Sequence, residues 1–116
     1  MNNFDIPIFK KSYDLYKTLH EYRKIIPKKD RFTVFERCEH AMLDVLETIL
    51  LASSQKKEEK ILTLERASLK LNMLRVFVRL LKDIKVIDTK KYITLENMID
   101  EIGRMLGGWI RSSKIK

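Results

Sequence analysis

Helical spacing of apolar residues is the feature of this chain that most restricts its fold. Apolar side chains recur every three or four residues through four segments, and the whole chain has only two prolines and three glycines to interrupt them. No segment shows the strict apolar–polar alternation of a half-buried strand. The expected helices run from Ile8 to Ile26, from Thr33 into the segment ASSQKK, from Glu58 to Lys85, and from Lys90 to Arg111.

The connections between these expected helices are short. Pro27 should end the first helix, because a proline disfavours the helical conformation in the residue before it. Thr33 and Glu36 have the spacing of a capping box, and Asp88 or Thr89 is suited to cap the last helix. Four antiparallel helices with short links predict an all-α, up-down four-helix bundle that forms one domain over residues 1–116.

The third expected helix carries two apolar stripes. One contains Ile61, Leu64, Leu71, Leu74, Val78 and Leu81, and the other contains Leu62, Leu69, Met73, Val76 and Leu80. A helix of an isolated four-helix bundle needs only one such stripe, and a chain of this length has no fifth helix to cover the other. We therefore expect a homo-oligomer, with Leu69, Met73 and Val76 in the interface.

All three glycines, Gly103, Gly107 and Gly108, lie in the expected last helix, in the segment DEIGRMLGGWIRSS. Each glycine inside a helix costs roughly 1 kcal/mol relative to alanine, so the cluster calls for an explanation. One explanation is close packing at Gly103 and Gly107, with the large Trp109 ring filling the adjacent space. The other is that Gly107 and Gly108 end the helix as C-caps. Because apolar spacing continues after them, the sequence favours close packing.

The chain is basic, with 24 Lys and Arg residues against 16 Asp and Glu, a formal net charge of +8. Such an excess favours an anionic partner, most commonly nucleic acid. The candidate contacts lie on the third helix: Arg66, Lys70, Arg75, Arg79 and Lys82. No homeodomain, zinc-finger or RNA-recognition motif is present, so these residues predict contact with phosphates and not base readout. A simple solvated face, or an acidic protein partner, would explain the same charges.

Catalytic and metal-binding patterns are weak. His40 has Glu36 and Asp44 four residues to either side, but it lacks the paired histidines of a helical zinc motif. Cys38 lies on an apolar stripe and should be a small buried side chain. The segment GRMLGG lacks the ending of a phosphate-binding loop and follows no strand. We therefore expect no enzymatic activity, no cofactor and no metal.

The location of the protein is predicted from what its sequence lacks. The start of the chain has no signal-peptide pattern, and no apolar run approaches the roughly 20 residues of a membrane span. A single cysteine, which cannot form an internal disulfide, fits a reducing compartment. These features predict a cytoplasmic protein without a membrane partner.

Three segments carry a resemblance to a known family: IPKKDRFTVFERC, ASLKLNMLRVFVRLLKD and EIGRMLGGWIRS. They resemble the accessory variability determinant (Avd) family of diversity-generating retroelements. The resemblance extends from about Tyr13 to Ser112, and GRMLGGW and the RF…ER pair are its more specific parts. The Avd family belongs to a wider group of four-helix-bundle proteins that includes those encoded in intervening sequences of bacterial 23S ribosomal RNA genes.

The resemblance implies a barrel-like homopentamer of four-helix bundles with a basic surface. It further implies association with the retroelement's reverse transcriptase and its template RNA, in support of error-prone cDNA synthesis. The matching positions are Arg31, Phe32, Glu36, Arg37, Lys70, Leu71, Arg75 and Gly103 to Trp109. Phe35 departs from the pattern, because the family usually has a glycine there. The alternative is an oligomeric scaffold of the ribosomal-gene type that acts through protein–protein contacts.

Overall fold

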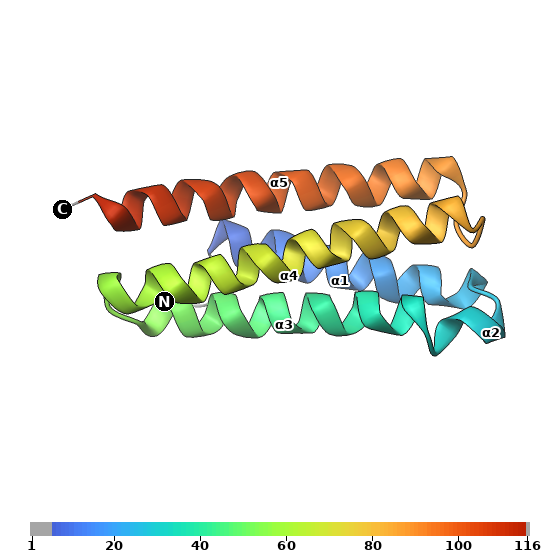
Figure 1. Ribbon diagram of the computed structural model, residues 1–116, viewed down its shortest axis with the longest axis horizontal. Coiled ribbons are helices and arrows are strands. Elements are labelled where there is room, and N and C mark those ends of the chain that lie inside the picture. The colour runs from blue at the N-terminus through green and yellow to red at the C-terminus, as the bar shows by residue number, and fades with distance from the viewer. Residues whose placement is uncertain (1–5, 116) are drawn as a thin grey trace.

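Four long helices pack side by side as an antiparallel bundle in the computed structural model, which describes residues 6–115 (Figure 1). They are α1 (Pro7–Tyr22), α3 (Val34–Ser54), α4 (Lys57–Asp83) and α5 (Thr89–Lys114). Consecutive long helices are neighbours in space, and α5 also packs against α1, so the four helices surround one core. The beginning of α1 and the end of α5 lie at the same end of the bundle. The predicted up-down four-helix bundle is confirmed.

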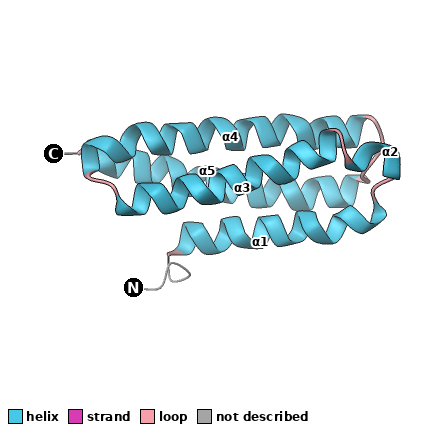
Figure 2. Cartoon of the chain, turned by 90° about the horizontal axis from the view of Figure 1, so that it is seen from below, coloured by secondary structure: helices cyan, strands magenta, loops and turns pink. Residues whose placement is uncertain are grey.

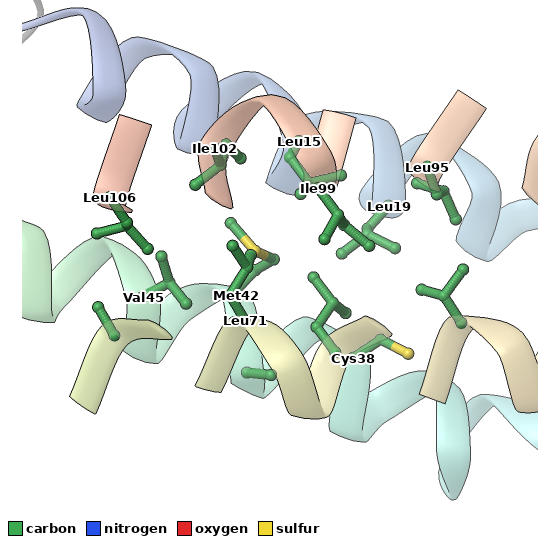
Figure 3. Packing of buried hydrophobic residues seen from close by; sticks show 14 of the residues in the cluster. Leu15, Leu19, Cys38, Met42, Val45, Leu71, Leu95, Ile99, Ile102 and Leu106 are labelled. Atoms are coloured by element: carbon green, nitrogen blue, oxygen red, sulfur yellow. The ribbon is translucent and has the colours of Figure 1, made fainter. Parts of the chain in front are cut away.

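The core lies along the bundle axis and receives side chains from all four long helices. Figure 3 shows Leu15 and Leu19 of α1 near Ile99 of α5, with Met42 of α3 and Leu71 of α4 pointing toward them. The first predicted stripe of α4 faces this core: Leu64, Leu71, Leu74, Val78 and Leu81 are at most 1% exposed. The match explains why helical spacing in the sequence predicted the fold, since each buried position recurs with the period of the helix.

The first helix ends earlier than the sequence predicted. Instead of continuing to Ile26, α1 stops at Tyr22 and is followed by a 3₁₀ turn, η2 (Arg23–Ile25). Pro27 is the cause, because Ile26 has the extended conformation (φ −76°, ψ 129°) that a following proline favours. One helical turn, α2 (Lys28–Arg31), then closes this end of the bundle (Figure 2).

One of the predicted helix caps is wrong and the other is confirmed. Thr33 precedes α3, but its side chain makes no capping bond and instead donates to the Asp30 carbonyl oxygen at 3.3 Å. The α2 turn therefore takes the hydroxyl that the predicted capping box with Glu36 required. At α5, the backbone N–H of Lys91 donates to the Asp88 carboxylate at 2.8 Å, as predicted. This hydrogen bond lowers the pKa of Asp88.

The turn after α4 reverses the chain without a glycine. The helix ends at Asp83, and Lys85 adopts the left-handed conformation with φ 64°. The N–H of Lys85 donates to the Lys82 carbonyl oxygen at 3.0 Å, and the N–H of Val86 donates to the Leu81 carbonyl oxygen at 2.8 Å. These two bonds form a Schellman motif, which satisfies carbonyl groups that the helix end leaves without partners.

Candidate nucleic-acid and assembly surfaces

The second apolar stripe of α4 lies on the outside of the bundle. Leu62, Leu69 and Val76 are 74%, 60% and 64% exposed, Leu80 is 39% exposed, and Met73 is half-buried. We call these five residues the outer stripe. They lie on the side of α4 opposite to its core residues, and no helix within residues 6–115 covers them. The prediction that the chain leaves this stripe uncovered by its own helices is confirmed.

Arg75, a predicted nucleic-acid contact, joins α4 to α5. Its Nη1 donates to Asp100 Oδ1, and the same nitrogen lies 3.6 Å from Glu96 Oε1. A Cβ atom added to Gly103 would lie 3.6 Å from Arg75 Nη2, in ordinary van der Waals contact. A Cβ atom at this position would therefore fit beside the guanidinium without displacing it. Two carboxylates of α5 therefore offset the positive charge of Arg75.

The other two cations on this side of α4 are also in contact with neighbouring side chains. Arg79 Nε donates to both carboxylate oxygens of Asp83 at 3.2 Å. That hydrogen bonding raises the pKa of the Arg79 guanidinium. The Lys82 ammonium nitrogen lies 4.9 Å from the centroid of the Tyr92 ring, a cation–π contact with α5.

Arg66 and Lys70 lie on the opposite flank of the outer stripe. Lys70 Nζ is 3.4 Å from Asp44 Oδ2 on α3, so this flank faces α3 while Arg75 faces α5. Arg66 is exposed, and within residues 6–115 it has no ion-pair or hydrogen-bond partner. The five basic residues predicted to bind nucleic acid are therefore divided between two flanks, and four of them already contact a carboxylate or an aromatic ring.

The C-cap explanation for the α5 glycines is wrong. The helix continues through Gly107 and Gly108 to Lys114, and no glycine in residues 6–115 has a positive φ. A Cβ atom added to Gly107 would meet only Arg111 Nη1 of the same helix, at 3.4 Å. No other helix of the subunit therefore packs closely against Gly107. Gly103 is the glycine that faces α4.

Trp109 lies half-buried against the core, near the end of α5. The Lys60 ammonium nitrogen is 5.5 Å from the centroid of its ring, which links α5 to the first turns of α4. The ring thus packs against side chains of the same subunit, as an amphipathic aromatic side chain does at the edge of a core.

Reactive groups are few in the part of the chain that the structure describes. Cys38 is buried in the core, as predicted, and burial raises the pKa of its thiol to about 12. Within residues 6–115, no three His, Cys, Asp or Glu side chains are grouped to hold a metal ion. None of the helices described is long and apolar enough to cross a membrane.

A sequence model of one family, bAvd-like, matches residues 7–113. The chain belongs to the bAvd-like family. This family membership agrees with the Avd resemblance that its three segments predicted. None of the curated proteins matches the chain.

A solved structure similar to this bAvd-like chain comes from Bacteroides thetaiotaomicron. It is described as a protein of unknown function from the S23 ribosomal protein family. The two are 19% identical, with a TM-score of 0.79, over 89% of this chain and 97% of the other. At this identity the comparison shows a shared fold alone. The shared fold agrees with the wider four-helix-bundle group to which the Avd family was assigned.

The RF…ER residues of this bAvd-like chain lie at the α2 end of the bundle. Phe35, which stands where a glycine was expected, is fully buried in the core, so the bundle accommodates the larger side chain there. Phe32 is 60% exposed, and the Arg37 guanidinium lies 5.8 Å from the centroid of the Phe77 ring. Arg31 Nε donates to the Ile26 carbonyl oxygen at 2.8 Å.

Sequence reasoning did not group the basic residues that gather around Arg31. His20, Arg23 and Lys24 lie close to it, and the four side chains line a hollow of about 390 Å³. The spacing of the first three residues, i, i+3 and i+4, was a usable signal, because it places them on one face of a helical turn. The missing information was the α2 turn after Pro27, which brings Arg31 back beside them.

Proposed function

We propose that this protein is a non-catalytic accessory subunit of a diversity-generating retroelement. It assembles as a homo-oligomer, a pentamer, and binds the element's reverse transcriptase and template RNA to support mutagenic cDNA synthesis. Membership of the bAvd-like family supports the retroelement role. The outer stripe of α4 is the observation that carries the proposal, because an accessory subunit of this kind acts as an assembly and the stripe provides the surface for one.

Burial of the outer stripe would contribute favourable free energy to self-association. Leu62, Leu69 and Val76 each expose more than half of their side chains. Complete burial of such a side chain contributes roughly 1.5–3 kcal/mol. Because each of the three is more than half exposed in the subunit, its burial in an interface would contribute about half of that amount or more. Monomeric proteins rarely leave a contiguous apolar stripe of this kind in water.

Two observations support an anionic partner. The chain has a formal net charge of +8, and Arg66 on the flank of the outer stripe is exposed without a counter-charge within residues 6–115. An assembly repeats these charges once per subunit and thereby raises the positive potential around it. A scaffold that acts through protein–protein contacts alone would be expected to capture a protein partner without binding RNA.

Light scattering of the purified protein tests the assembly. We expect a mass several times that of the 13.9 kDa chain, with five subunits as the specific expectation. Leu69→Asp and Val76→Asp should each yield monomers, because a carboxylate placed in an apolar interface loses its hydration. Ile93→Asp is the matched control, since Ile93 is 50% exposed on α5, outside the outer stripe. A wild-type monomer at micromolar concentration contradicts the proposal.

Capture of the polymerase tests the accessory role. The reverse transcriptase encoded beside this protein's gene is immobilised and exposed to the wild type, to Val76→Asp and to Ile93→Asp. We expect retention of the wild type and Ile93→Asp together with template RNA, and loss of Val76→Asp. Retention without any RNA dependence would favour the scaffold, and the absence of a reverse-transcriptase gene nearby would contradict the retroelement role.

A further inference from the structure

The α2 end of the bundle has a hollow lined only by basic side chains. His20, Arg23, Lys24 and Arg31 surround a volume of about 390 Å³, which we call the end hollow. The first three follow one another around the last turn of α1 and the start of η2, and Arg31 reaches them from α2. Within residues 6–115, no carboxylate lines the end hollow. Its composition fits an anion.

Arg31 is a positioned cation without a counter-ion. Its Nε donates to the Ile26 carbonyl oxygen at 2.8 Å, and its Nη2 donates to the Lys24 carbonyl oxygen at 3.4 Å. No carboxylate pairs with it within residues 6–115. Since a guanidinium has five N–H donors, several remain available to a ligand. Two carbonyl groups therefore hold the side chain in place while its charge remains uncompensated.

Arg23 links the end hollow to an exposed aromatic ring. Its Nη1 donates to Glu39 Oε1 at 2.5 Å, and Glu39 is 7% exposed, so the guanidinium is firmly held. The Arg23 guanidinium carbon lies 5.3 Å from the centroid of the Phe32 ring, which is 60% exposed. A largely exposed aromatic ring therefore lies beside one of the residues that line the end hollow.

A second hollow adjoins the first along α1. It has a volume of about 370 Å³ and is lined by Tyr13, Tyr16, Lys17, His20 and Glu21. We call it the side hollow. His20 lines both hollows, so they form one continuous surface. The Lys17 ammonium nitrogen lies 5.7 Å from the centroid of the Tyr13 ring, which again places a cation beside an aromatic ring.

We propose that the end hollow and the side hollow together form a binding site for single-stranded RNA. This inference rests on the proposed function, which supplies RNA as the partner. Phosphates would lie against Arg31 and Lys24, and unpaired bases would stack on Phe32 and contact Tyr13, which is 38% exposed. Single-strand binding sites combine these two elements, a cationic path for the backbone and aromatic faces for the bases.

The largely exposed Phe32 ring favours RNA over an acidic protein segment and over a duplex. An acidic segment needs only the cations, and a duplex keeps its bases stacked on one another and unavailable to Phe32. On α4, by contrast, Arg75 pairs with Asp100 at partly buried positions, so a phosphate would have to displace that carboxylate. Among residues 6–115, the ion-pair partner of Lys24 is Glu21, at 3.6 Å, with both side chains largely exposed, a pair that contributes little.

Fluorescence-anisotropy titrations with labelled single-stranded oligoadenylate test the site. The main variant is Lys24→Gln/Arg31→Gln. The matched controls remove the same two charges elsewhere: Arg75→Gln/Arg79→Gln on α4, and Lys56→Gln/Arg111→Gln at the opposite end of the bundle. We expect the main variant to lower the slope of log affinity against log salt by about 1.4, since each neutralised phosphate of a single strand contributes about 0.7. Both controls should keep nearly the wild-type slope.

Phe32→Ala tests stacking, and its exposure makes it harmless to the core. We expect affinity for oligoadenylate to fall about 5-fold or more, because a base stacked on an aromatic ring contributes about 1–3 kcal/mol. Affinity for a polyglutamate probe should not change. Lys24→Gln/Phe32→Ala, which changes two exposed side chains and leaves the Arg31 bonds intact, repeats the test if Arg31→Gln lowers the helical circular dichroism signal.

Three results would overturn the inference. Equal losses in all three charge variants would mean that only net charge matters. A loss confined to Arg75→Gln/Arg79→Gln would place RNA on α4. Equal losses of oligoadenylate and polyglutamate, with Phe32→Ala unchanged, would assign the hollows to an acidic protein. If the wild-type protein binds no RNA, the RNA part of the proposed function fails as well, whereas assembly and polymerase capture are judged by their own measurements.

Discussion

Replacement of Gly107 with alanine should stabilise the subunit by about 1 kcal/mol, the amount by which glycine is less favourable than alanine inside a helix. Gly107 lies inside α5, which continues to Lys114, and it has no positive φ that alanine would resist. Among the residues that the structure describes, the new Cβ would meet only the far end of the Arg111 side chain, at 3.4 Å. The subunit therefore offers no steric cost to offset the gain.

Urea unfolding, followed by circular dichroism, measures this gain in two backgrounds. In the monomeric Val76→Asp background, Gly107→Ala should raise the free energy of unfolding by about 1 kcal/mol. Gly103→Ala is the internal control. A Cβ atom added there would lie 3.7 Å from the Leu71 side chain and 3.6 Å from Arg75 Nη2 of the same subunit, which are ordinary contact distances. The same comparison in the wild-type background then reports on the assembly.

A loss of stability on Gly107→Ala in the monomeric background would refute the reasoning. A gain there, with a loss of about 1–3 kcal/mol in the assembled protein, would place a second subunit against Gly107 and would mean that the predicted close packing at this glycine occurs between subunits. A gain in both backgrounds would remove Gly107 from the interface, and the outer stripe would remain the assembly surface.

Two further predictions concern titratable groups. Burial raises the pKa of Cys38 to about 12, from 9.0, so the folded state keeps a proton that the unfolded state loses. The free energy of unfolding should therefore fall between pH 9 and 12, by about 1.4 kcal/mol per pH unit more in the wild type than in Cys38→Ala. Urea titrations at several pH values measure both slopes, and equal slopes would contradict the prediction. Hydrogen bonding to the Lys91 N–H lowers the pKa of Asp88, so its stabilisation exists above that pKa and disappears as the pH falls through it. Asp88→Ala should melt below the wild type at pH 7, and the difference should vanish in acid; a constant difference would contradict it.

The bundle was predictable from the sequence because its signal is periodic and local. Leu64, Leu71 and Leu74 recur on one helical face, and the same spacing places all three in the core. The break at Pro27 and the cap at Asp88 were also readable, since each depends on one residue and its immediate neighbours. Thr33 failed as a cap because the α2 turn, which no local rule indicated, engages its hydroxyl.

The candidate site was less predictable because it depends on which helices are neighbours and in what register. Arg75 meets Asp100 across 25 positions of sequence, and Lys70 meets Asp44 on a different helix. Spacing along α4 alone presents both cations as free. Likewise, only the return of the chain at Pro27 brings Arg31 beside His20 and forms the end hollow. The outer stripe, in contrast, was predicted correctly because excess apolar periodicity can be counted in the sequence.

The left-handed Lys85 in the turn after α4 has a consequence for how the fold responds to ionic strength. A residue with a Cβ atom is strained there by roughly 1–2 kcal/mol, a strain that glycine would avoid. Lys85 follows the carbonyl end of α4, where the helix dipole is negative and a cation is typically stabilising, which would offset part of the strain. Salt screens that attraction but leaves the strain unchanged. Concentrated salt should therefore loosen this turn first, and hydrogen exchange at Val86, whose N–H closes the Schellman motif, would report it.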